Sequence, residues 1–131
     1  MPLPVVSLYA GINGLIALAL AIRVVRLRGK TGTGIGSGGH AALEQAIRVH
    51  GNFSEYVPLI LILLALLELD GMPAWRLHLL GSALTLGRIL HAWGLSSTAG
   101  LSFGRSVGIA LTWAVLLATA VAALWAGAQA L

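Results

Sequence analysis

The chain has 131 residues, of which 58% are hydrophobic and only 9% are charged, and its mean hydropathy is +0.93. A soluble domain of this size would have too little polar surface to cover itself, so the composition predicts a membrane protein. The net charge is +4, but no basic run is interleaved with aromatic residues, which excludes a nucleic-acid-binding protein. The absence of cysteine excludes a disulfide framework and a protein thiol nucleophile.

The apolar pattern predicts an all-α fold, a four-helix transmembrane bundle that forms one domain over residues 1–131, with helices at 3–28, 40–68, 74–95 and 102–126. The first uncharged run, from Leu3 to Ile22, is long enough to span a bilayer. It is followed by a basic cluster: Arg23, Arg26, Arg28 and Lys30. Because basic residues remain on the cytoplasmic side, we expect both termini outside and this cluster in the cytoplasm.

The segments between the helices are rich in glycine. Residues 29–39 contain six glycines and predict a flexible cytoplasmic loop. A phosphate-binding loop is excluded, because Val24 stands where that pattern needs glycine. Gly71 and Pro73 predict a tight turn at the outer side.

Within the fourth predicted helix, Gly104 and Gly108 form a G-x-x-x-G pattern, which indicates helix packing.

One face of the second predicted helix is polar. Arg48, Asn52 and Glu55 fall at positions i, i+4 and i+7, so a cation, an amide and a carboxylate share that face. Arg48 lies near one membrane edge, and Glu55 lies about 10 Å deeper, where a charge needs a partner. Arg88 on the third helix has the same expected depth. We therefore expect an ion pair between Glu55 and Arg88, within one chain or between chains.

Further cations and hydrogen-bond donors are expected in the cytoplasmic half of the bundle. A peptide-like anion could be held there while an apolar molecule approaches from the bilayer. The members of this set are Arg48, Asn52, Tyr56, Arg88, His91 and Arg105. The four histidines do not have zinc-ligand spacing, so no metal site is predicted, and no Gly-x-Ser-x-Gly elbow is present.

The stretch from Arg48 to Leu59, with its pattern Arg-x-x-x-Asn-x-x-Glu-Tyr-x-Pro, resembles the signature of the MAPEG family, the membrane-associated proteins in eicosanoid and glutathione metabolism. The bacterial branch of that family is the most similar. The resemblance covers essentially the whole chain in length and number of helices. It implies a homotrimer in the bacterial inner membrane, with glutathione as co-substrate bound between subunits at the cytoplasmic side.

Carried over by position, the resemblance assigns glutathione contacts to one residue set: Arg48, Asn52, Glu55, Tyr56 and Arg88. The basic residue that ends the first helix and reaches a glutathione carboxylate corresponds to Arg23, Arg26 or Arg28, of which Arg28 is the candidate. The chain departs from the eicosanoid-forming members in carrying His91 and Leu95 at helix positions where those members have tyrosines. Ser102 stands at the position of their thiol-activating arginine, and Arg105 follows three residues later.

The function expected from these residues is attack by glutathione on a lipophilic electrophile or hydroperoxide dissolved in the membrane. A free thiol has a pKa of about 8.5, and a guanidinium nearby in a low-dielectric site favours the thiolate. Arg105 is the first candidate for this catalytic role and His91 the second. The alternative is a membrane scaffold or transporter subunit without catalysis, in which the same polar residues serve assembly.

Overall fold

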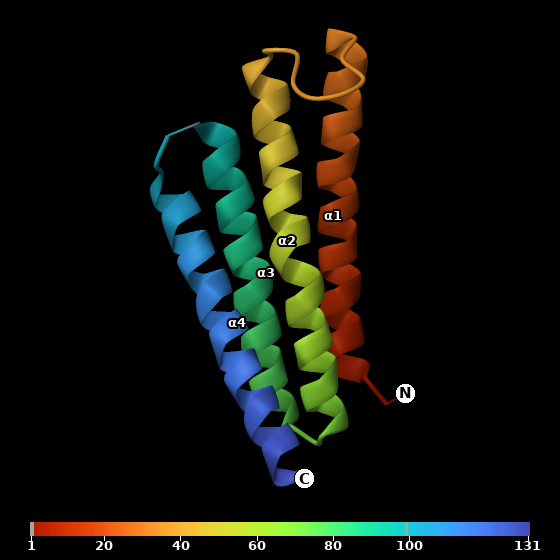
Figure 1. Cartoon of the computed structure of the whole chain (residues 1–131), viewed down its shortest axis with the longest axis vertical. Helices are drawn as coiled ribbons and strands as arrows, with labels where there is room; N and C mark the ends of the chain where they lie inside the picture. The colour runs from red at the N-terminus through yellow and green to blue at the C-terminus, as the bar shows by residue number, and fades with distance from the viewer. Residues whose placement is uncertain (1, 99) are drawn as a thin grey trace.

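A computed structural model of the chain describes residues 2–98 and 100–131. It confirms the all-α fold with four helices: α1 (Pro4–Thr31), α2 (Ala41–Leu69), α3 (Ala74–Ser97) and α4 (Phe103–Gln129). The helices form an up-and-down bundle, and both termini lie at the same end (Figure 1). The opposite end therefore gathers the α1–α2 and α3–α4 connections.

Three of these helices, α1, α2 and α4, are long and apolar enough to cross a membrane. The third helix is more polar because it carries arginine and histidine on both of its halves: Arg76, His78, Arg88 and His91. Arg88 and His91 are buried against neighbouring helices. A helix that shields its polar groups in this way can lie among apolar helices without exposing them to lipid.

The predicted helix limits are close to those of the structure, but the first loop begins later than residue 29. Helix α1 continues through Thr31 and ends at Gly32, whose φ of +64° lies in the left-handed region that glycine adopts readily. The glycine-rich connection between α1 and α2 is held by hydrogen bonds from α1. The Arg28 guanidinium donates to the carbonyls of Thr33, Gly34 and Gly36 at 3.0–3.2 Å, so one side chain orders the glycine-rich loop.

At the end of the bundle that holds the termini, a carboxylate joins the start of α1 to the last turn of α2. Helix α1 begins with Pro4, which has no N–H to satisfy. The next two amides, of Val5 and Val6, donate to the two oxygens of Glu68 at 2.9 and 2.8 Å. Glu68 thus caps α1 from the last turn of α2. The turn that follows contains Gly71 at φ +86°, as the sequence predicted.

The apolar core lies along the inner faces of α2 and α3. Its buried side chains come from these helices and from α1 and α4, and they include Val6, Ile60, Leu64, Leu77, Leu84 and Val115. Helix α2 contributes at spacings of three and four residues, which is the period of one helix face. This packing leaves the polar face of α2 pointing away from the core.

Helices α3 and α4 approach each other through glycines, and they lie side by side in Figure 1. A Cβ at Gly108 would lie 2.5 Å from the His91 backbone nitrogen, and one at Gly104 would lie 3.0 Å from the Leu90 carbonyl. A Cβ at Gly94 would likewise overlap the first turn of α4. The packing role predicted for Gly104 and Gly108 is confirmed. This close contact sets the distance between His91 and the start of α4.

We expect Gly108→Ala to destabilise the protein by about 1–3 kcal/mol, because the new methyl group overlaps the α3 backbone. Gly127→Ala is the matched control on the same helix, because nothing lies within 4 Å of a Cβ there. That substitution should be neutral or stabilising, since alanine favours helix over glycine. Thermal unfolding of both variants in detergent measures the difference, and equal midpoints would contradict the close packing.

Candidate functional site

A cavity of about 270 Å³ lies between α2, α3 and α4, at the end of the bundle opposite the termini. Its lining combines cations, a carboxylate, amides and a histidine: Ala41, Glu44, Gln45, Arg48, Asn52, His91, Leu95 and Arg105. In the part of the chain that the structure describes, no group of three His, Asp or Glu side chains could hold a metal ion. The polar and charged lining offers hydrogen bonds and charge for a small polar ligand.

Helix α2 supplies most of the polar lining. Gln45, Arg48 and Asn52 are spaced by three and four residues, so they follow one face of the helix. The other face, which includes Leu43 and Val49, is buried in the bundle. The sequence analysis began this face at Arg48 and missed Glu44 and Gln45. The same helical spacing, continued one turn toward the start of the helix, is the signal that would have found them.

The fourth helix places a cation at its own first turn. Ser102 is the N-cap residue, and its hydroxyl accepts a hydrogen bond from the Arg105 amide at 3.3 Å. The Arg105 guanidinium also donates to the Gly100 carbonyl at 3.4 Å. A cation in the first turn opposes the helix dipole, which is positive at that end. Arg105 and the α4 N-terminus therefore both favour an anion in the cavity.

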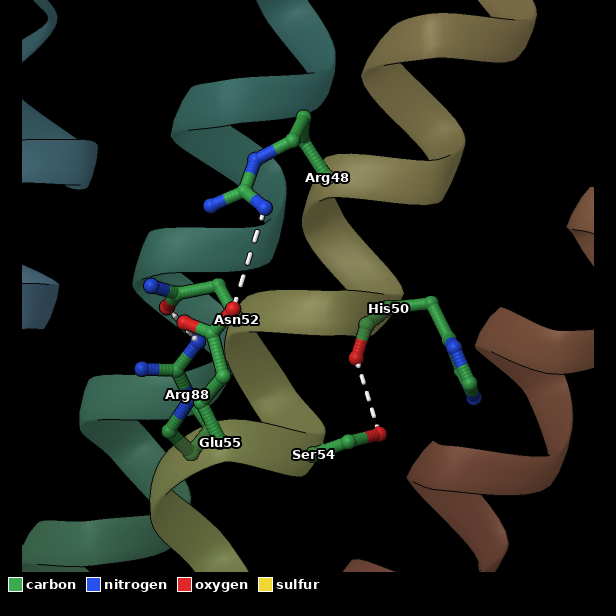
Figure 2. Close-up of polar contacts among 6 residues, drawn as sticks. All are labelled: Arg48, His50, Asn52, Ser54, Glu55 and Arg88. Carbon is green, nitrogen blue, oxygen red and sulfur yellow. Dashed lines mark hydrogen bonds and ion pairs between the residues drawn. The ribbon is translucent and has the colours of Figure 1, made fainter. Parts of the chain in front are cut away.

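Arg88 is fully buried and lies behind the cavity lining. Its Nη2 donates to Asn52 Oδ1 at 2.6 Å and lies 3.2 Å from His91 Nδ1, and its Nη1 donates to Thr112 Oγ1 at 3.3 Å. Its guanidinium also stacks on the Phe53 ring at 5.8 Å. Figure 2 shows the contact with Asn52 between α3 and α2. Arg88 thus joins three helices and supports two residues of the lining.

The expected ion pair between Glu55 and Arg88 is wrong for the single chain. Glu55 instead pairs with Arg48 at 3.7 Å, and both side chains are more than half exposed, at 51% and 60% (Figure 2). The prediction rested on equal depth along the helices, and depth does not fix direction around the helix axis. Arg88 points inward to Asn52, whereas Glu55 lies on the outer face of α2.

The remaining predicted contacts lie apart from the cavity lining. Tyr56 is half-buried and packs against the apolar core. Arg28 holds the first loop through three carbonyls, and Arg23 donates to the Ser96 hydroxyl of α3. Arg26 is exposed on α1. In one chain the structure therefore brings together only part of the predicted set in the cavity: Arg48, Asn52, His91 and Arg105.

We expect Asn52→Ala to destabilise the protein by about 1–3 kcal/mol, because it removes an acceptor from the buried Arg88 guanidinium. The control is Ser54→Ala on the same helix, since the exposed Ser54 hydroxyl donates to the carbonyl of His50 in its own helix (Figure 2). Chemical denaturation in detergent should show a much smaller effect for that control. Equal losses would mean that the Asn52 contact contributes little.

Comparisons with known proteins show the family to which the chain belongs. The model of the MAPEG family matches residues 6–125. The chain is also 36% identical over 119 residues to the inner membrane protein YecN of Escherichia coli K12, which covers 91% of this chain and 89% of YecN. YecN of Escherichia coli O6:H1 matches to the same extent. With three helices apolar enough to span a bilayer, the chain is an integral membrane protein and belongs to the MAPEG family.

Proposed function

We propose that this protein is a glutathione-dependent membrane enzyme that joins glutathione to lipophilic electrophiles or reduces lipophilic hydroperoxides. The observation that carries the proposal is the charge pattern of the cavity. Two guanidiniums, from Arg48 and Arg105, and one carboxylate, from Glu44, line a space that also holds amide and imidazole groups. Family membership supports the same assignment.

The cavity lining complements several of the polar groups of glutathione. Glutathione carries two carboxylates, one ammonium group, two peptide units and a thiol. Arginine binds carboxylates through paired charge-assisted hydrogen bonds, and Glu44 can accept from the ammonium group. The amide side chains of Gln45 and Asn52 can bond to peptide groups. A neutral apolar molecule could form none of these hydrogen bonds.

A second and third copy of the chain would complete the site, in a homotrimer. The Arg48–Glu55 pair lies on an exposed face of a helix that is apolar enough to span the bilayer, where exposed charge is costly unless protein or water covers it. The cavity of one chain, at about 270 Å³, is close to the lower end of the roughly 300–1,000 Å³ of typical ligand sites. Arg26, exposed on α1, could reach a ligand held by a neighbouring copy.

We place the protein in the inner membrane with its termini outside and the cavity facing the cytoplasm. The proposal is supported by the difference in basic residues between the two ends of the bundle. The cavity end carries the basic residues that close α1, including Arg23, Arg26 and Lys30, whereas Arg76 is near the other end. Basic residues favour the cytoplasmic side. Glutathione would then enter from the cytoplasm and the lipophilic substrate from the bilayer.

In the proposed reaction the glutathione thiol loses its proton and the thiolate sulfur attacks the second substrate. With an electrophilic carbon, a C–S bond forms and a leaving group departs or a double bond takes up the electron pair. With a hydroperoxide, the O–O bond breaks to give an alcohol, and a second glutathione converts the oxidised sulfur to glutathione disulfide and water. Arg105 stabilises the thiolate by its charge in a low-dielectric site.

We expect saturable glutathione binding to the detergent-purified oligomer, with affinity at least tenfold weaker in Arg48→Ala, because a charge-assisted contact is worth about 1.5–3 kcal/mol. Arg76→Ala removes an equal charge at the opposite end and should bind normally. Isothermal titration calorimetry measures the glutathione affinity of the unaltered protein and of both variants. Absence of binding by a folded, oligomeric sample would favour the scaffold or transporter function, in which the polar residues serve assembly.

Arg105→Ala separates thiol activation from binding. When each variant is saturated with glutathione, we expect the ultraviolet absorbance of the bound thiolate to persist in Arg48→Ala and to fall sharply in Arg105→Ala. Loss of one unit of pKa lowering corresponds to about 1.4 kcal/mol, a tenfold change in the thiolate to thiol ratio. An unchanged thiolate signal in Arg105→Ala would show that another group ionises the sulfur.

A further inference from the structure

The buried Arg88 guanidinium controls which atoms its neighbours turn toward the cavity. Every polar atom of a guanidinium is a donor, and none can accept a hydrogen bond. Arg88 is fully buried, and its partners include two cavity residues, Asn52 and His91. Each partner must therefore present an acceptor to Arg88. What each of them presents to the cavity follows from that requirement.

For Asn52 the consequence is a fixed amide orientation. Its Oδ1 accepts from Arg88 Nη2 at 2.6 Å, and its amide nitrogen points away from Arg88 in Figure 2. The opposite orientation would place an NH₂ group against a guanidinium, donor against donor. The side of Asn52 that a ligand meets therefore carries N–H groups.

For His91 the consequence concerns the position of its proton. The ring nitrogen 3.2 Å from Arg88 Nη2 is Nδ1, so Nδ1 must carry a lone pair and the ring proton must be on Nε2. An imidazolium would place N–H against N–H and one cation against another. We infer that Arg88 holds His91 as the neutral Nε2–H tautomer, which donates a hydrogen bond to an acceptor in the cavity.

This assignment makes His91 a donor to the ligand and removes it from the candidates for a general base. The only lone pair of the ring faces Arg88, and Nε2 already carries its proton. Together with Asn52, Arg48 and Arg105, His91 gives the cavity a wall composed mainly of donors. Such a wall selects a ligand rich in acceptors, such as a carboxylate or a thiolate. The identity of that ligand rests on the proposed function, whereas the tautomer does not.

Nuclear magnetic resonance of ¹⁵N-histidine-labelled protein tests the tautomer directly, in the full chain without ligand. His91→Gln assigns the signal of His91 among the four histidines. We expect a protonated Nε2 and an unprotonated Nδ1 at neutral pH. The internal comparison is His78, whose Nδ1 lies 3.1 Å from the Tyr9 hydroxyl, a group that can both donate and accept. An Nδ1–H tautomer or an imidazolium at position 91 would overturn the inference.

Arg88→Met tests the cause of this tautomer, since methionine fills similar space without donors. We expect the His91 signals to shift to a mixture of the two tautomers in that variant. An unchanged, pure Nε2–H signal would overturn the role of Arg88. If Arg88→Met does not fold, the spectrum of the unaltered chain still decides whether His91 has the inferred tautomer.

Two substitutions of His91 test donation to the ligand. The amide nitrogen of glutamine reaches the position of Nε2, whereas that of asparagine stops near Nδ1. We expect His91→Gln to keep glutathione affinity within about threefold and His91→Asn to lose about tenfold, equivalent to about 1.4 kcal/mol. The reverse order would overturn donation from Nε2. Absence of glutathione binding by the unaltered chain would instead count against the proposed function. It would not bear on the tautomer, because nuclear magnetic resonance measures the tautomer without ligand.

Discussion

A guanidinium without exposed surface, that of Arg88, lies between α2, α3 and α4, and its hydrogen bonds connect these helices. Arg88 is held by an amide from α2, a hydroxyl from α4 and an imidazole of its own helix. Removing one partner of a buried ion or hydrogen-bonded charge is more costly than removing an exposed pair. The positions of α2, α3 and α4 around the cavity are therefore linked through one side chain.

Close packing supplies the second constraint. Glycines on both sides of the α3–α4 contact allow the two backbones to approach where a Cβ would overlap. This approach brings His91 of α3 and Arg105 of α4 to the same cavity. Small residues at helix contacts are typical of membrane proteins, where lipid is as apolar as the helix surfaces and packing must provide the attraction. The same feature that stabilises the bundle thus positions two polar groups.

On the outer face of α2, two charged side chains remain exposed in the single chain. Arg48 and Glu55 neutralise each other at 3.7 Å but remain more than half exposed, on a helix apolar enough to cross a bilayer. Charge in that position is stable only beside protein or water. The proposed homotrimer would explain the exposed ion pair, because a neighbouring copy would cover it.

Much of the fold was determined by the sequence alone. Long apolar runs, basic residues after the first run, and glycine and proline at the turns specify four helices and their order, because length and hydropathy are local properties. Arg48 and Asn52 were also identifiable, since residues four apart share a helix face. The Gly104 and Gly108 contact was predicted from spacing and is confirmed.

Only the tertiary structure decided how the helices are rotated toward one another. Depth along the helix suggested that Glu55 would pair with Arg88, but the rotation of α2 and α3 turns Arg88 to Asn52 and His91 and leaves Glu55 with Arg48. Likewise Arg28 does not line the cavity but donates a hydrogen bond to a carbonyl of the first loop. Such pairings depend on the angles between helices, which result from packing over the whole bundle and are not encoded in local spacing.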